Sequence, residues 1–126
     1  MSQLLIGDVL RSNAARLPNA VAAWLDGEEL TYAALETRTQ ALVPALAAAG
    51  VKRGDRIAWQ AEVSLEVIAL YFAAARLGAT FVPLNPRYTA EETARIIAHA
   101  DPRLVLGDKV SGHDTLAGLL DRKSVV

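Results

Sequence analysis

The sequence predicts an α/β fold in which an N-terminal β-hairpin precedes strands and helices that alternate and form a parallel sheet. Short apolar segments at 56–60, 80–84 and 103–106 are separated by longer segments with helical spacing, the order typical of such a sheet. The clearest strand lies within Gly78–Pro86, where a glycine precedes an apolar run that prolines end. The chain has 126 residues, 52% of them hydrophobic, so we expect residues 1–126 to form a single domain with a core.

The composition excludes several classes of function. The 13 basic and 14 acidic residues are spread along the chain, which leaves no basic stripe for a nucleic-acid backbone. The absence of cysteine excludes a thiolate nucleophile, and two separate histidines predict no metal site. The longest apolar run, Val67–Ala75, is far shorter than the ~20 residues that cross a bilayer. Because the N-terminus also lacks a basic leader, we expect a cytoplasmic protein with no membrane span and no nucleic-acid partner.

The first elements are a helix and a hairpin. Apolar residues at helical spacing predict a helix over 7–16, and Pro18 ends it because the residue before a proline is pushed out of the helical region. The segment 21–25 has the composition of a strand, and Asp26-Gly27 is typical of the turn that returns it through 29–31. We therefore expect an antiparallel hairpin.

A second helix follows the hairpin. Thr31 can cap it by accepting a hydrogen bond from an early backbone amide, and Gly50 ends it. Its buried face is expected to consist of Leu35, Leu42, Leu46 and Ala49. Pro44 removes the amide that would bond to the Gln40 carbonyl and costs about 3 kcal/mol, so we expect a kink or a break near Gln40.

The helix expected over 64–77 is apolar on every side. Its polar residues are Ser64, Glu66 and Arg76, with Tyr71 amphipathic. Such a helix must be covered by more than one layer, which a small domain seldom provides. We therefore expect the chain to belong to something larger.

The last third of the chain contains two more helices around a strand. Thr89 and Glu92 form a predicted capping box for a helix that ends before Asp101-Pro102. We expect that helix to bury Ala94, Ile97 and Ala98. Gly107 ends the strand at 103–106, and Asp114 or Thr115 can cap a short helix that holds Leu116, Leu119 and Leu120. The residues Ser124-Val125-Val126 have the composition of the start of a strand, and Pro83 places its own strand at an edge or a bulge.

No residue is assigned a catalytic role from its spacing. Ser64 has no nucleophile-elbow pattern and is expected to cap a helix. His99 lies at a helix end, where a cation favours the dipole, and His113 lies in a polar turn, where we expect it to be solvated. The pairs Glu28-Glu29 and Glu91-Glu92 lie in a turn and at a helix N-terminus, positions that explain them without acid/base or metal chemistry. We expect Trp24 and Trp59 to be core or sheet-surface residues, because each lies in a predicted strand.

Several segments in order resemble the N-terminal end of the adenylate-forming enzymes, the superfamily of acyl-CoA synthetases, peptide-synthetase adenylation domains and luciferases. The matching segments are Leu30–Leu35, Gly50–Ala58, Ser64–Glu66, Ala75–Ala79 and Val82–Arg87, with the family's first core motif resembling Leu30-Thr31-Tyr32 and its second Leu77–Asn85. The run from Asn85 to Thr89 resembles an acyl-CoA synthetase more than a peptide-synthetase domain, in which aspartate commonly follows Val-Pro. Val63, where asparagine is common, and Pro44 depart from the pattern.

The resemblance implies the reaction of a longer parent ligase, as in fatty acid metabolism. A carboxylate and ATP give an acyl-adenylate and then an acyl thioester on CoA, so ATP, Mg and CoA are the cofactors expected for the parent. The family's phosphate loop and catalytic lysine come later than this sequence reaches, so we expect the chain alone to bind no cofactor and to be inactive. By resemblance, Asn85, Pro86 and Arg87 lie near the channel through which CoA reaches the adenylate. The alternative is that Pro86 only ends a strand and Arg87 makes a surface ion pair.

Two roles remain open from the sequence. In the first, the chain is an N-terminal fragment that serves as a scaffold, and its partner is the rest of the parent polypeptide. In the second, it is a free-standing, non-catalytic interaction module that docks through the helix at 64–77. In either role an exposed apolar patch of that size would favour self-association as a homo-oligomer. A fragment should leave Leu116–Leu120 and Val125-Val126 poorly ordered or paired with another copy, whereas a module should bury them. An unrelated α/β binding protein is disfavoured by the number of ordered matches.

Overall fold

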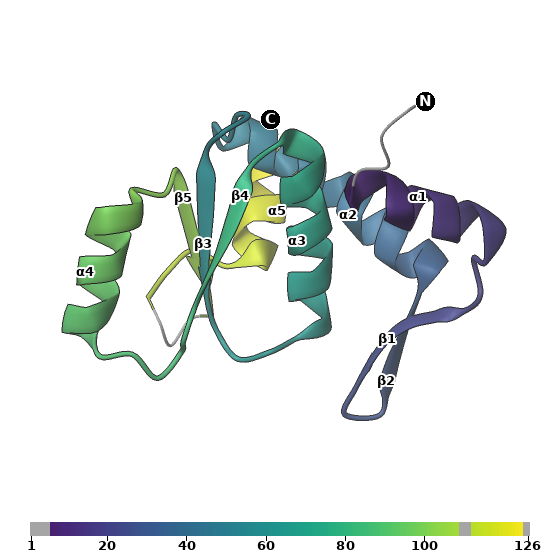
Figure 1. The fold of residues 1–126 in the computed structure, drawn as a ribbon, viewed down its shortest axis with the longest axis horizontal. Helices are drawn as coiled ribbons and strands as arrows, with labels where there is room; N and C mark the ends of the chain where they lie inside the picture. Colours follow the sequence, from purple (N-terminus) through teal and green to yellow (C-terminus); the bar gives the residue numbers. More distant parts are fainter. Residues whose placement is uncertain (1–5, 109–111, 125–126) are drawn as a thin grey trace.

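The computed structural model describes residues 6–108 and 112–124, and it has the predicted α/β fold (Figure 1). The elements in chain order are α1 (Ile6–Arg16), β1 (Val21–Leu25), β2 (Glu28–Thr31), α2 (Tyr32–Ala48), β3 (Arg56–Gln60), α3 (Leu65–Leu77), β4 (Thr80–Leu84), α4 (Ala90–Ala100), β5 (Leu104–Gly107) and α5 (Leu116–Ser124). An N-terminal hairpin and an alternation of strands and helices are both present, so the predicted fold class is confirmed.

The hairpin forms as the turn sequence predicts. Strands β1 and β2 pair antiparallel, with Leu25 opposite Glu28. Asp26 and Gly27 both have positive φ angles, 51° and 81°, which suits the tight turn that joins strands with a right-handed twist. Trp24 is 65% exposed, so this tryptophan is a sheet-surface residue, whereas Trp59 on β3 belongs to the core.

The second sheet is parallel and has the strand order β4-β3-β5 in the described residues. Residues 56–60 of β3 pair in register with residues 80–84 of β4, and residues 57–60 pair with β5. Strand β4 is therefore an edge strand, and Pro83 is exposed on it, which confirms its predicted place at an edge.

The two faces of the parallel sheet are packed very differently (Figure 1). Helices α1, α2, α3 and α5 lie on one side of the sheet with the hairpin, and α4 lies alone on the other. The main core fills the first side and contains Leu10, Leu30, Leu35, Leu42, Ala45, Leu46, Val51, Ile57, Trp59, Leu65, Ala69, Leu70, Ala73, Ala74, Leu106, Leu116 and Leu119. This core covers α3 from several directions, so much of the apolar surface of the helix is buried by other elements of the same chain.

The inward face predicted for α4 is wrong. Ala94 and Ala98 are exposed and Ile97 is half-buried, whereas Thr93 is buried. Side chains alternate along a strand, so if Ile57 and Trp59 face the main core, Ala58 and Gln60 face α4. A small residue and an amide offer little apolar surface to pack against, which explains why the helix turns a hydroxyl inward.

Several local predictions have a clear outcome. Helix α2 runs unbroken through Pro44, so of the kink or break expected near Gln40 the break is wrong, and the kink stays a prediction. Thr31 and Thr89 cap their helices, and the Thr89–Glu92 capping box is complete. Ser64 stands at the N-cap of α3, but its side chain makes no capping hydrogen bond.

The C-terminal helix packs as a short cap on the core. The Thr115 hydroxyl accepts a hydrogen bond from the Gly118 amide at 3.0 Å, as predicted for a cap. Leu116 and Leu119 are buried while Leu120 is exposed. Ser124 belongs to α5, so its assignment to a strand is wrong, and residues 125–126 lie outside the described residues. Burial of Leu116 and Leu119 is what a free-standing module predicts, whereas the exposed Leu120 is not, so these residues favour neither the fragment nor the module.

Candidate functional site

The carboxyl ends of β3, β4 and β5 meet at one edge of the sheet (Figure 1). The chain leaves β3 for β4 on one side and then crosses to β5 on the other side of β3. Ligands of open α/β sheets bind outside the carboxyl ends of the strands, at such a reversal of direction. This edge, which we call the carboxyl edge, is therefore the candidate site, and it contains the predicted loop Asn85–Arg87.

Gln60, the last residue of β3, connects three segments at this edge. Its side-chain nitrogen donates to the carbonyl oxygen of Asn85 at 3.1 Å and to the hydroxyl of Thr93 at 2.8 Å. Its side-chain oxygen lies 2.9 Å from Nε2 of His113. Only the amide nitrogen can donate to a carbonyl, so the orientation of the amide is fixed and His113 must donate through Nε2. Gln60 is 5% exposed, and these contacts satisfy the buried amide.

His113 is not the freely solvated side chain that its polar turn predicts. It is half-buried and hydrogen-bonded to a glutamine 53 residues away along the chain. The prediction failed because a turn residue is assigned to solvent by its local sequence, which contains no information about a partner on β3. Gln60 itself was missed for the same reason, although an amide at the end of an apolar strand is the type of signal that could have indicated it.

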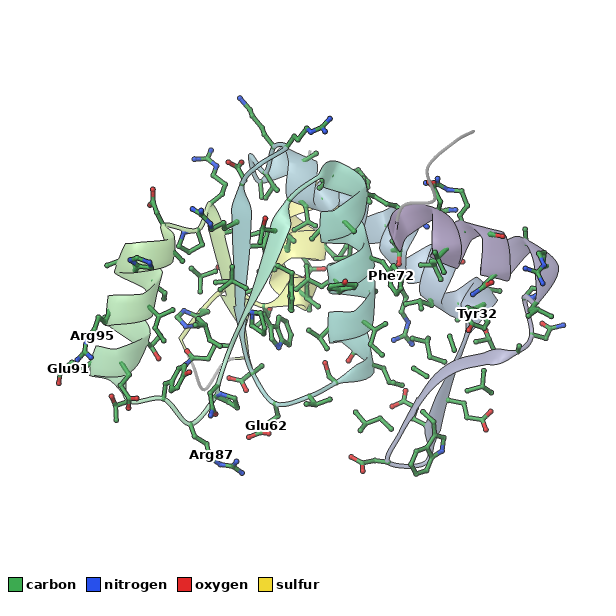
Figure 2. The ribbon with its side chains drawn as sticks, in the orientation of Figure 1. Tyr32, Glu62, Phe72, Arg87, Glu91 and Arg95 are labelled. Carbon is green, nitrogen blue, oxygen red and sulfur yellow. The ribbon has the colours of Figure 1, made fainter. Side chains whose placement is uncertain are left out.

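The predicted loop residues lie together at the carboxyl edge. Asn85, Pro86 and Arg87 are all exposed, directly after β4. The Asn85 side-chain oxygen accepts from the Arg87 amide at 2.9 Å, and the Asn85 carbonyl accepts from the Tyr88 amide at 3.1 Å. Figure 2 shows the Arg87 side chain pointing away from the sheet at this edge. The loop therefore presents a cation to the outside from a hydrogen-bonded turn.

A hollow of about 380 Å³ lies beside this loop. It is lined by Gln60, Tyr88, Ala90, Thr93, Ala94, Ile97 and His113. Its polar groups are a phenol, an imidazole, a hydroxyl and an amide, on an otherwise apolar wall. Gln60 already bonds to Thr93 and to His113 within this wall, so the exposed Tyr88 phenol is the group that can hydrogen-bond a ligand.

The opposite, amino edge of the sheet has a polar hollow of about 340 Å³. Arg56 donates to the Ala100 carbonyl at 3.0 Å, and Arg103 donates to the Gly50 carbonyl at 3.2 Å. These carbonyls lie at the C-terminal ends of α4 and α2, where cations are favourable. The two arginines therefore have a structural explanation as helix caps.

A buried ion pair joins α2 to α3. Arg76 donates to both carboxylate oxygens of Glu36, and Gln40 donates to the same carboxylate at 2.7 Å. The Arg76 hydrogen bond lowers the pKa of Glu36, more strongly than burial raises it. The sequence offered one signal, because Arg76 is the only cation in a helix that is apolar apart from Glu66 and the amphipathic Tyr71.

The histidine and glutamate residues for which the sequence predicted a structural role lie at the expected ends of their helices and strands. His99 is exposed in the last turn of α4, and Glu91 and Glu92 lie exposed in its first turn. Glu28 and Glu29 are exposed at the hairpin turn. Within the described ranges, no three His, Asp or Glu side chains are grouped so that they could hold a metal ion. No helix in the same ranges is long and apolar enough to span a membrane.

Comparison with known proteins identifies relatives over most of the chain. A family model described as AMP-binding enzyme matches residues 10–126. The acyl-CoA ligase SID4 of Ajellomyces capsulatus is 32% identical over 126 residues, which cover 97% of this chain and 21% of SID4. The L-proline--[L-prolyl-carrier protein] ligase of Pseudomonas fluorescens is 33% identical over 102 residues, or 81% of this chain and 20% of that protein.

Solved structures give the same result. VinN in complex with 3-methylaspartate is 30% identical with a TM-score of 0.84, over 94% of this chain and 37% of that one. The NpsA N-terminal subdomain of Klebsiella oxytoca, in complex with 3-hydroxyanthranilyl-AMSN, is 25% identical with a TM-score of 0.82, over 94% and 31%. The chain thus spans about a fifth of the length of these two ligases, 21% and 20%. It belongs to the family of AMP-binding enzymes, the adenylate-forming superfamily, and corresponds to its N-terminal portion.

Proposed function

We propose that this chain supplies the N-terminal subdomain of an AMP-forming acyl-CoA synthetase. In that reaction a carboxylate attacks the α-phosphate of ATP and releases pyrophosphate, and CoA then displaces AMP from the acyl-adenylate to give the thioester. The observation that carries the proposal is the identity of 32% to an acyl-CoA ligase over 97% of the chain. A cytoplasmic location belongs to the same proposal, because ATP and CoA are its cosubstrates.

The acceptor of the acyl group separates two candidate functions. The run Asn85-Pro86-Arg87 follows the Val82-Pro83-Leu84 stretch without the aspartate typical of peptide-synthetase domains, which supports CoA. The second candidate is transfer to a carrier protein, because a carrier-protein ligase is 33% identical over 81% of the chain.

The loop Asn85–Arg87 is the part of this chain that we assign to CoA. It is exposed at the carboxyl edge, and its hydrogen-bonded turn presents Arg87 outward. A guanidinium is well suited to phosphate, so Arg87 is matched to the charged end of CoA. ATP and Mg are assigned to the later part of a longer polypeptide.

Inactivity of the chain by itself also belongs to the proposal. Adenylation requires donors placed where charge develops in the transition state. In this chain the buried amide nitrogen of Gln60 and the two terminal nitrogens of Arg76 are directed at protein oxygens. The partner we assign is therefore the rest of a parent polypeptide. Docking through α3 is less well supported, since that helix is largely covered by the chain's own elements.

The test is a chimera in which this chain replaces the matching residues of SID4. Circular dichroism first establishes that the chimera is folded. We expect it to release pyrophosphate with ATP, Mg²⁺ and the carboxylic acid used by SID4, and to form the CoA thioester. The 126-residue chain and a SID4 variant lacking this region should release none.

Three outcomes would contradict the proposal. Pyrophosphate release by the purified chain alone would refute inactivity, and transfer only to a carrier protein would favour the second candidate. The intact mass of the native product is a measurement independent of the chimera. A mass equal to that of a chain ending at Val126 would refute the proposal that the chain is part of a longer polypeptide.

A further inference from the structure

We infer that Gln60 is a positioning residue, held in one amide orientation by the Asn85 carbonyl and bonded on its oxygen side to His113, which fixes the Asn85–Arg87 loop and the first turn of α4 to the sheet. The expected effect on CoA binding rests on the proposed function, because that function assigns the loop to CoA. The anchoring itself rests only on the contacts at the carboxyl edge.

A continuous series of hydrogen bonds runs from the sheet to the loop. Gln60 donates to the Asn85 carbonyl at 3.1 Å, and the same carbonyl accepts from the Tyr88 amide. The Asn85 side chain then accepts from the Arg87 amide at 2.9 Å. The backbone of Arg87 is thus two hydrogen bonds away from the buried end of β3.

Apolar packing contributes little to this part of the molecule. The loop residues are exposed, and α4 buries Thr93 while it leaves Ala94 and Ala98 exposed. The second donation from Gln60 goes to the Thr93 hydroxyl at 2.8 Å. One buried amide therefore bonds to both the loop and the first turn of α4, while Arg56 holds the other end of that helix through the Ala100 carbonyl.

The Asn85 carbonyl determines which way this amide points, and His113 bonds to the amide oxygen on the other side. A flipped Gln60 would place its oxygen against the Asn85 carbonyl, where two acceptors repel, and its nitrogen against the Nε2 of His113. In the observed orientation His113 supplies the donor that the buried Gln60 oxygen needs. The segment before α5 is therefore linked to the loop through β3.

The first experiment measures hydrogen exchange of individual amides in the 126-residue chain. Gln60→Leu should speed exchange of the Tyr88 and Thr93 amides by about tenfold, the effect of roughly one lost hydrogen bond. Amides in α2 and α3 should keep their rates. Unchanged rates at Tyr88 and Thr93 would overturn the inference, as would an equal increase throughout the chain.

Milder variants keep the test valid if Gln60→Leu does not fold. Thr93→Val removes one acceptor, and its matched control is Thr37→Val on the exposed surface of α2. His113→Phe removes the donor to the Gln60 oxygen, with His99→Phe as its control. We expect faster exchange at Tyr88 with the first member of each pair only. Equal effects from a variant and its control would overturn the inference.

The second experiment separates positioning from stability in the folded SID4 chimera. Thr93→Val and His113→Phe should raise the KM for CoA severalfold, with the rate of pyrophosphate release unchanged. An unchanged KM for CoA, or an equal loss in both steps, would overturn the positioning role. An inactive parent chimera would defeat the proposed function, and the exchange rates would still decide whether Gln60 anchors the loop.

Discussion

The carboxylate of Glu36 and the guanidinium of Arg76 face each other between α2 and α3 with 11% and 8% of their side chains exposed. One of their two contacts, Arg76 Nη1 to Glu36 Oε2, is 2.9 Å long. Both charges are removed from water, and each depends on the other for compensation. The contact joins the two helices that provide most of the main core, so its energetics bear on the whole fold.

Stability should fall at acidic pH because of Glu36. The Arg76 hydrogen bond lowers the pKa of this carboxyl below its ordinary value of 4.5. A lowered pKa in the folded state stabilises the protein fully above pH 4.5, and the stabilisation is lost as pH falls through the folded value. Urea unfolding between pH 7 and 3 measures the loss. Glu36→Gln should flatten the curve, whereas Glu91→Gln on the surface of α4 should leave it unchanged.

Removing only one member of the pair should be more damaging than removing both. Arg76→Met leaves a buried carboxylate without its partner, so we expect a loss of about 3 to 5 kcal/mol in the free energy of unfolding. The double variant Glu36→Leu with Arg76→Met removes both charges and should recover part of that loss. A double variant that is less stable than Arg76→Met would show that the pair itself stabilises the fold.

Two helix N-caps that look alike in sequence should respond differently to alanine. The Thr89 hydroxyl accepts from the Glu92 amide at 3.1 Å, so Thr89→Ala should destabilise α4 by about 0.5 to 2 kcal/mol. Ser64 makes no such bond, and Ser64→Ala should change stability far less. Hydrogen exchange of the amides in α4 and α3 measures both. Equal losses would mean that the Ser64 hydroxyl also caps its helix in solution.

Pro44→Ala should stabilise the protein. Pro44 is exposed inside an unbroken helix, so alanine restores a hydrogen bond to the Gln40 carbonyl without emptying the core. The gain of up to about 3 kcal/mol is reduced by about 0.4 to 1 kcal/mol, because the unfolded chain becomes freer. Pro18→Ala is the control, since Pro18 lies outside any helix and only the second effect applies. Thermal unfolding that shows no gain for Pro44→Ala would contradict this account.

Local signals predicted the elements well, because each depends on neighbouring residues. Asp26-Gly27 defines the hairpin turn, and Thr89 with Glu92 defines the start of α4. The continuous helix through Pro44 shows the limit of such rules. The local penalty at this residue is outweighed by the burial of Leu42, Ala45 and Leu46 on either side of it.

The contacts that build the candidate site could not be predicted in the same way. Gln60 and His113 are 53 residues apart, and the same holds outside the site for Glu36 and Arg76, which are 40 apart. Each pair forms only after the sheet and helices have assembled. The position of the Asn85–Arg87 loop was predictable, because parallel strands end at a common edge, but the residue that anchors it was not.

Pro83 gives the parallel sheet a direction in which it can grow. A strand that approached the outer edge of β4 would meet a residue with no amide proton to donate, so a regular ladder could not continue past it. At the outer edge of β5, residue Asp114 already pairs with Leu106 as an isolated parallel bridge. Any further strand, from a longer polypeptide or from a second molecule, should therefore add beside β5. Pro83 alone thus restricts the addition of strands to one edge of this sheet.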